Sequence, residues 1–223
     1  MKVKFIVIIT LAICFSMQSY SQNLNWENLK PEQEHVVNIN IGWDYGLVFG
    51  AGYGYKLKTK MPVVLQASQS FPSGKNIFDD FKTKVGAQIR LYKLNHIQLS
   101  TSINGVYRRY QNPLVSLSNF GSDVSVTAGY YRSRYFVAGE AGFDKAIVTH
   151  FKHSNSFKDV YPKVRDGWYE PATGGNFQYG LKTGFSTKNS DVTLRFGKVI
   201  TQDFKTTPLI PFYAGFGYAL KFK

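Results

Sequence analysis

Histidine, serine and aspartate side chains near residue 150 are the groups best suited to catalysis in this chain. His150, His153 and Ser154 follow one another closely, and Asp79 and Asp80 lie earlier in the sequence. A serine becomes a nucleophile when a histidine base reaches its hydroxyl at about 2.6–3.2 Å. Because neighbouring side chains of a strand point to opposite faces, His153 and Ser154 would not meet there. These five residues are therefore candidates for a catalytic site, but their spacing does not favour a hydrogen bond between the histidine base and the serine.

A metal site is a second chemistry that this region suggests. His150 and His153 stand three residues apart, with Asp159 and Asp166 following. Two histidines at this spacing, without a cysteine or a defined third ligand, do not specify a metal. We therefore expect no metal and no cofactor.

Charged residues in the strand-like segments are a third group of candidate functional residues. Glu140 and Asp144 lie four residues apart, on one face of a predicted strand, and can pair with a basic residue across an interior. Since buried charges persist when paired, the set predicts a structural salt-bridge network, with a selective polar pore as the alternative. The predicted interior polar residues are Lys82, Lys84, Arg90, Glu140, Asp144, Lys182 and Arg195.

The elements that must position these groups are strands, because side chains alternate along the chain. From residue 46 to 57, one face carries Leu, Phe, Ala and Tyr side chains and the other is mostly glycine. A period of two indicates a strand. The ten segments predicted in this way are 35–43, 46–58, 62–71, 80–92, 96–109, 121–132, 134–149, 176–186, 191–202 and 210–222.

Period alone does not separate a soluble β-sandwich from a transmembrane barrel, but the connections and ends do. Short and long connections alternate, and 150–175 is the longest. Aromatic residues such as Trp43, Tyr92 and Tyr135 fall near strand ends, and the chain ends in a strand with Phe222 next to last. Short inner turns, long outer loops and aromatic girdles are typical of outer-membrane barrels. The fold class predicted is all-β: one antiparallel up-and-down transmembrane β-barrel of about ten strands, with eight or twelve as alternatives.

The first residues predict export. Lys2 and Lys4 precede an apolar run that is too short to span a membrane, and small residues flank a cleavage point after Ser21. We expect a signal peptide over 1–21, a periplasmic N-terminal segment or short plug over 22–34, and the barrel over 35–223. The only cysteine, Cys14, lies in the predicted signal peptide, so the mature chain would have no thiol chemistry.

The chain resembles bacterial outer-membrane β-barrel proteins, and its signal ending Ser-Tyr-Ser-Gln is similar to those of Bacteroidota. Two enzyme families show a fainter resemblance. Lipid A deacylases carry a histidine, one spacer and Ser-Asn, whereas His153 here directly precedes Ser154-Asn155. Omptin-type proteases oppose acidic residues to an Asp/His pair, which implies a comparison of Asp79 and Asp80 with His150 and His153.

The function predicted is that of an integral, porin-like outer-membrane protein of a Gram-negative cell envelope. It would be non-catalytic, acting as a narrow pore or as a structural or accessory subunit of an envelope complex. An outer-membrane hydrolase that uses the 150–175 loop is the alternative. The formal charge of +13 favours contact with lipopolysaccharide phosphates among the outer-membrane lipids. Export argues against a nucleic-acid partner.

Overall fold

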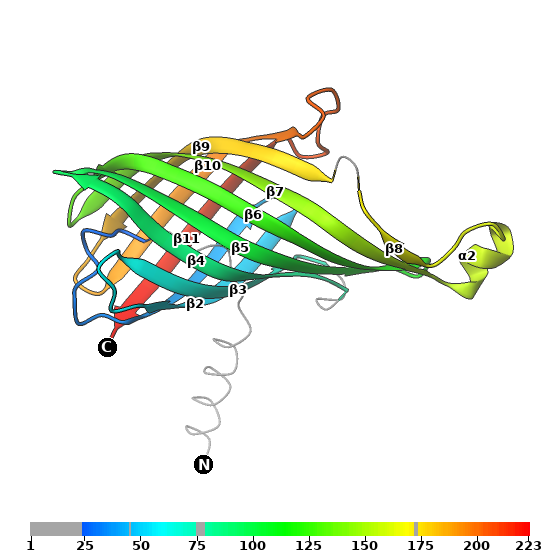
Figure 1. Ribbon diagram of the computed structural model, residues 1–223, viewed down its shortest axis with the longest axis horizontal. Coiled ribbons are helices and arrows are strands. Elements are labelled where there is room, and N and C mark those ends of the chain that lie inside the picture. The colour runs from blue at the N-terminus through cyan, green and yellow to red at the C-terminus, as the bar shows by residue number, and fades with distance from the viewer. Residues whose placement is uncertain (1–23, 45, 75–78, 172–173) are drawn as a thin grey trace, which may run out of the picture.

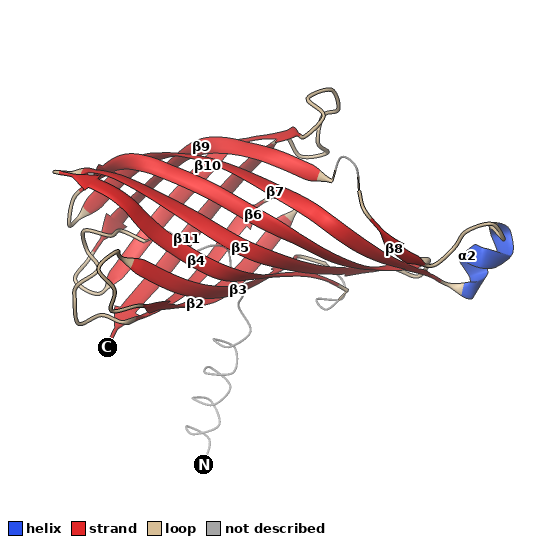
Figure 2. Cartoon of the chain, viewed as in Figure 1, coloured by secondary structure: helices blue, strands red, loops and turns tan. Residues whose placement is uncertain are grey.

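The computed structural model describes residues 24–44, 46–74, 79–171 and 174–223, so the predicted signal peptide lies outside the described residues. Strands dominate, as Figure 2 shows. The elements in chain order are β1 (His35–Trp43), β2 (Leu47–Lys56), β3 (Val63–Pro72), β4 (Asp80–Leu94), β5 (Ile97–Gln111), β6 (Val115–Tyr131), β7 (Tyr135–His153), α2 (Asn155–Val160), β8 (Gly167–Tyr169), β9 (Gly175–Ser186), β10 (Ser190–Thr201) and β11 (Phe212–Phe222).

Ten of the strands in the described part of the chain close into an antiparallel barrel (Figure 1). Each strand from β1 to β7 pairs with the next, β7 pairs with β9, and β9, β10 and β11 lead back to β1. The seam between β1 and β11 runs from His35 opposite Phe222 to Trp43 opposite Ala214. A closed ring has no free edge, which satisfies the backbone donors and acceptors of every strand. The prediction of a ten-stranded barrel is confirmed.

Two ends of the barrel differ in their connections. At the turn end, the connections are 57–62, 95–96, 132–134 and 187–189, and both termini of the barrel lie there. At the loop end, the connection between β7 and β9 is the longest and contains α2 and β8. Within the described residues, no helix is long and apolar enough to cross a membrane.

The hairpin of β6 and β7 is longer than the sequence predicted. Residues 115–120 were expected in a loop, but β6 begins at Val115 and β7 continues to His153. Phe120 pairs with Val148 and Gly121 with Ala146, so Ile147 is an extra residue in β7. This bulge shifts the alternation of β7 by one residue near its outer end. The extension reaches beyond the other strands in Figure 1 and ends at β8 and α2.

Polar and apolar residues are distributed in the reverse of a soluble protein. In β5, Asn104 is 2% exposed and its neighbour Ile103 is 51% exposed; in β11, Lys221 is 1% exposed and Leu220 is 43% exposed. The interior contains many glutamine, serine and threonine side chains, whereas valine, leucine, isoleucine and aromatic side chains cover the outside. A soluble sandwich would bury its apolar face, so this surface is suited to lipid.

Glycines allow one close contact inside the wall. Gly180 in β9 pairs with Gly197 in β10. A Cβ atom would lie 2.5 Å from the Tyr213 hydroxyl at Gly180 and 2.6 Å from it at Gly197. The two glycines therefore make room for the buried Tyr213 ring to lie across the inner face of the neighbouring strands.

Candidate functional site

The lumen at the loop end contains two adjoining cavities. One has a volume of about 430 Å³ and the other about 130 Å³. Six residues line both, so the two form one column of space that we call the outer column. The shared residues are Lys82, Lys84, Arg108, Asp123, Asp144 and Asn176.

Most charges in the outer column have an opposite charge close by. The Lys84 Nζ lies 2.7 Å from Asp123 Oδ2, and Asn104 donates a second hydrogen bond, of 3.2 Å, to the Asp123 carboxylate. Nearer the loop end, Lys82 Nζ lies 3.7 Å from Asp44 Oδ2. Charges in a low-dielectric wall stabilise the fold only when paired, so these ion pairs fix the side chains that line the column.

Glu140 is the centre of the deepest charged layer. Its carboxylate lies 2.7 Å from Lys182 Nζ and 3.7 Å from Arg195 Nε, and it accepts a 2.8 Å hydrogen bond from the Tyr213 hydroxyl. The Arg195 guanidinium also lies 4.6 Å from the centre of the Tyr213 ring. This cluster, which we call the Glu140 layer, lies along the inner wall over four neighbouring strands, β7, β9, β10 and β11.

Two members of the predicted interior set have other surroundings. The Arg90 guanidinium lies 5.9 Å from the centre of the Trp26 ring, a cation–π contact at the turn end, rather than beside Glu140. Asp144 lines both cavities of the outer column and, among the described residues, has no ion pair within 4.0 Å. The structure therefore brings Lys182 and Arg195 to Glu140, and leaves Asp144 facing the open space.

The candidate catalytic histidine and serine have separate partners. The His153 ring bonds the Asp166 carboxylate at 3.0 Å. Ser154 caps α2: its hydroxyl accepts a hydrogen bond from the Phe157 backbone N–H and lies 3.0 Å from the Ser156 hydroxyl. Among the described residues no hydrogen bond joins His153 to Ser154.

The remaining candidates are spread along the loop end. His150 packs on Trp168 with ring centres 4.9 Å apart, and Asp80 makes a two-point ion pair with Arg108. The Asp79 carbonyl accepts a hydrogen bond from Gln111. Asp80 and Phe151 lie in one row of the sheet, three strands apart, which is about 14 Å along the sheet. The acidic pair and the histidines thus lie on separate strands.

Asp166 holds the tip of the extension together. Its carboxylate accepts a 2.6 Å bond from Lys158 and a 2.9 Å bond from the backbone N–H of His153. The Lys158 ammonium, followed by the two His153 groups, holds the pKa of Asp166 well below its usual range. No cluster of three or more His, Cys, Asp or Glu residues of metal-binding geometry occurs within the described ranges.

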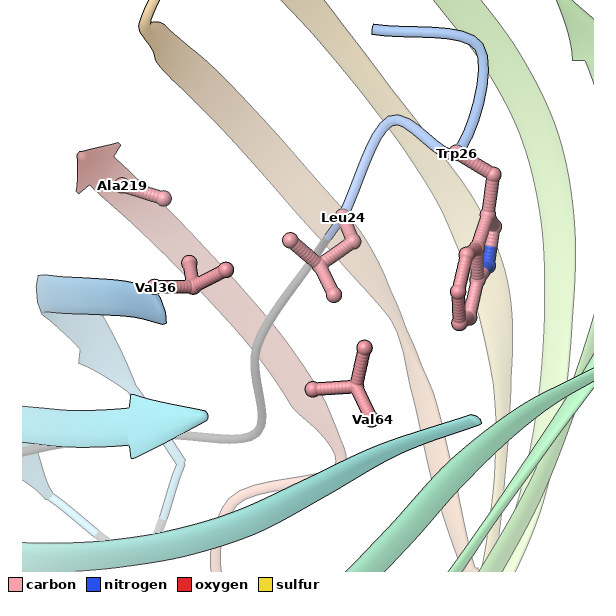
Figure 3. Close-up of a cluster of buried hydrophobic side chains, with 5 residues drawn as sticks. All are labelled: Leu24, Trp26, Val36, Val64 and Ala219. Carbon is pink, nitrogen blue, oxygen red and sulfur yellow. The ribbon is translucent and has the colours of Figure 1, made fainter. Parts of the chain in front are cut away.

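The turn end of the lumen is filled by residues 24–33, which we call the plug. Leu24 and Trp26 point into the barrel and pack with Val36, Val64 and Ala219 of the wall (Figure 3). Glu34 then joins the plug to β1. The buried polar side chains of the plug are Asn25, Asn28 and Gln33.

A buried ion pair of the wall forms the socket of the plug. Asp191 and Lys221 are fully buried, and their charged atoms lie 2.7 Å apart. The Asp191 carboxylate also accepts hydrogen bonds from the Asn25 backbone N–H and the Asn28 side chain. The sequence did not reveal this socket. The one signal was the inward register of Lys221, and nothing in the pattern indicated which residue would meet it.

Comparison with known proteins gives similarity to solved structures that include porins. No family model matches the chain, and no curated protein does. A KdgM porin in complex with disordered oligogalacturonate is 9% identical, with a TM-score of 0.42, covering 84% of this chain and 99% of that chain. A second KdgM porin structure has a TM-score of 0.43 at the same identity and coverage. A mutant porin of Rh. blastica is 7% identical, with a TM-score of 0.21, covering 85% of this chain and 99% of that one. These similarities are too low to transfer a solute or an activity.

Proposed function

We propose that this protein is an outer-membrane channel that carries small hydrophilic solutes through the lumen of its barrel. The observation that carries the proposal is the outer column, a continuous charge-lined space that runs from the loop end to the Glu140 layer. A purely structural barrel of this size could fill its interior with side chains. Here, water-sized space is preserved between paired charges.

The outside of the barrel supports placement in the outer membrane. Apolar side chains cover the strands, and exposed aromatic residues such as Trp43, Tyr92 and Tyr135 lie at or near strand ends. Such girdles sit at the two membrane interfaces. In this orientation the turn end faces the periplasm, and the predicted signal peptide over 1–21 would deliver the chain there. We assign it to a Gram-negative envelope of the Bacteroidota type.

The charge of the outer column favours anions weakly. Within the described residues, six basic side chains and four acidic side chains line its two cavities. Because most are paired, the net field is modest, and small anions should pass more readily than cations of equal size. The six basic residues are Lys82, Lys84, Arg108, Lys145, Lys182 and Arg195.

Single-channel recording in planar bilayers tests the proposal. The folded protein, identified by its heat-modifiable gel mobility, should give discrete channel events with a slight preference for chloride over potassium. Arg195→Gln should shift the selectivity toward cations, because Arg195 lines the outer column. Lys198→Gln is the matched control, since Lys198 lies on the same strand with its side chain exposed. Absence of channel events both from the folded full chain and from a folded variant lacking residues 24–33, which fill the turn end, rejects the proposal.

An accessory role in an envelope complex is a second candidate, supported by the extension of β6 and β7. Its tip exposes Tyr161, Trp168 and Tyr169, three large aromatic side chains beyond the barrel. Lys152, Lys163 and Arg165 lie in the same region and can contact lipopolysaccharide phosphates. A pull-down from detergent-solubilised membranes, comparing the full chain with one lacking residues 154–166, tests this role. A stoichiometric partner captured only by the full chain would support it.

A further inference from the structure

The plug contacts the whole circumference of the turn end. The described residues of the plug are bonded to the turn-end residues of β2, β4 and β11 and to the turns 132–134 and 187–189, so their contacts are spread round the ring. The contacts in order round the ring are Lys56 Nζ to Lys30 O at 2.7 Å, Lys93 Nζ to Glu27 Oε1 at 2.6 Å, Asn25 Nδ2 to Arg132 O at 2.8 Å, Asn28 Nδ2 to Thr187 O at 2.6 Å, and Lys221 Nζ to Asn28 O at 3.5 Å.

These contacts close the lumen at one end only. Leu24 is 2% exposed and Trp26 is 4% exposed, so little water reaches the inner face of the plug. The cavities of the outer column lie on the other side of the Glu140 layer and are lined by no plug residue. The lumen is therefore closed at the turn end and open at the loop end.

The plug is not part of the barrel wall. None of residues 24–33 belongs to a strand, and the wall pairs continuously from β11 to β1 without it. Its covalent link to the barrel wall is Glu34, whose backbone N–H bonds the Phe222 carbonyl and whose carbonyl accepts from the Lys56 backbone N–H. A segment joined at one point, and otherwise held by side-chain contacts, can leave while the ring of strands stays closed.

We propose that residues 24–33 are the gate of the channel, seated on the Asp191–Lys221 pair and swinging about Glu34. The inference rests on the proposed channel function. The seated plug is the closed state, and release of Asn25 and Asn28 from Asp191 opens the turn end to the periplasm. The Glu140 layer then lines the path of the solute, and the position of the plug determines whether solute passes.

A disulfide tether tests the gate directly. Asn25 Nδ2 lies 2.9 Å from the Ser186 hydroxyl, so the pair Asn25→Cys and Ser186→Cys places two thiols across the contact between plug and wall. The natural chain has one cysteine, Cys14, which precedes the plug in the predicted signal peptide. The mature tethered protein therefore contains only the introduced pair, locked by oxidation or a short thiol cross-linker and released by reductant.

Two further variants loosen the plug. The double variant Asn25→Ala, Asn28→Ala removes four side-chain hydrogen bonds of the two asparagines, and should raise the ratio of open to closed channel on the order of a hundredfold to a thousandfold. Asn112→Ala in an exposed turn of the loop end is the matched control and should change nothing. Deletion of residues 24–33 should give a channel that stays open.

The outcomes of the recordings separate the gate from the channel. Openings that vanish on locking, return on reduction and become frequent in the double alanine variant support the gate. If the locked channel opens as often as the reduced one, or the deletion variant behaves as the full chain does, the gate is refuted while the channel stands. If no folded variant conducts, including the deletion variant, the channel itself is refuted. Should the deletion variant fail to fold, the tether alone decides.

Discussion

Replacement of Asp191 by alanine should strongly destabilise the barrel at its turn end. The change leaves the Lys221 ammonium without its counter-charge at a site that is completely buried. Removing one partner of a buried ion pair costs about 3–5 kcal/mol. Asn25 and Asn28 also lose their acceptor, at about 1 kcal/mol for each neutral hydrogen bond. The free energy of unfolding should fall by about 5 kcal/mol or more.

A double replacement separates the effect of the unpaired buried charge from the effect of the lost hydrogen bonds. In the variant Asp191→Leu, Lys221→Met both charges are gone, and apolar side chains of similar volume often substitute for a buried pair without loss. The two asparagine contacts and the contact from Lys221 Nζ to the Asn28 carbonyl are then missing, which leaves a loss of about 2–3 kcal/mol. The double variant should therefore be about 3 kcal/mol more stable than the Asp191→Ala variant.

Urea unfolding in lipid vesicles measures these differences. Trp26 packs in the plug and reports its release by fluorescence, while heat-modifiable gel mobility reports loss of the barrel. Glu34→Gln serves as the control, because it breaks an ion pair whose lysine side chain is 77% exposed, and it should leave the unfolding midpoint unchanged. A single variant within about 1 kcal/mol of the natural protein, or a double variant as unstable as the single one, would refute the reasoning.

Three other substitutions test the remaining features. Ile39→Arg places a charge on the exposed apolar face of β1 and should reduce folding into vesicles by about 2–4 kcal/mol, measured as the folded fraction against urea; an unchanged fraction would contradict a lipid-facing surface. Gly180→Val forces a side chain against Tyr213 and should cost about 1–3 kcal/mol, whereas Gly105→Val has room for its Cβ and should cost less. The lowered pKa of Asp166 means that its carboxylate stabilises the tip fully above the usual carboxyl range and loses this effect only as the pH falls below it. Asp166→Asn should therefore speed proteolysis of the tip at pH 7, and the difference from the natural protein should persist down to about pH 4 and shrink at lower pH. Equal rates for both proteins at pH 7 would contradict this.

The alternation of side chains along the sequence was sufficient to predict the strands of the barrel. It did not predict which side chains meet inside the lumen. Alternation located all ten strands of the ring because each strand has one face toward the lumen. It lost β6 between 115 and 120, because Leu117 lines the lumen there, the reverse of the polar-inward pattern of the other strands. It also missed α2, which is one short turn begun by the Ser154 cap. A six-residue helix is too short to show a 3.6-residue period.

The candidate site depended on contacts that no local pattern encodes. The strand faces indicated that Glu140 points inward, but whether it would meet Arg90, Lys182 or Arg195 depends on the order and register of the strands in the ring. The plug is a stronger example. Residues 24–33 show no periodicity, and Asn25 meets Ser186 across 161 positions of sequence. Such a pairing follows from ring closure and cannot be inferred from spacing.

The contact between the plug and Lys221 joins the two ends of the chain. Asn28 and Lys221 are 193 positions apart, and the socket for the plug exists only after β11 has paired with β10 and brought Lys221 to Asp191. Loop closure over so much chain is slow, so seating of the plug is among the last events of assembly. Until then Leu24 and Trp26 are uncovered. An unfinished barrel therefore exposes the Leu24 and Trp26 side chains, and a finished one hides them, so their burial reports that the two ends of the chain have met.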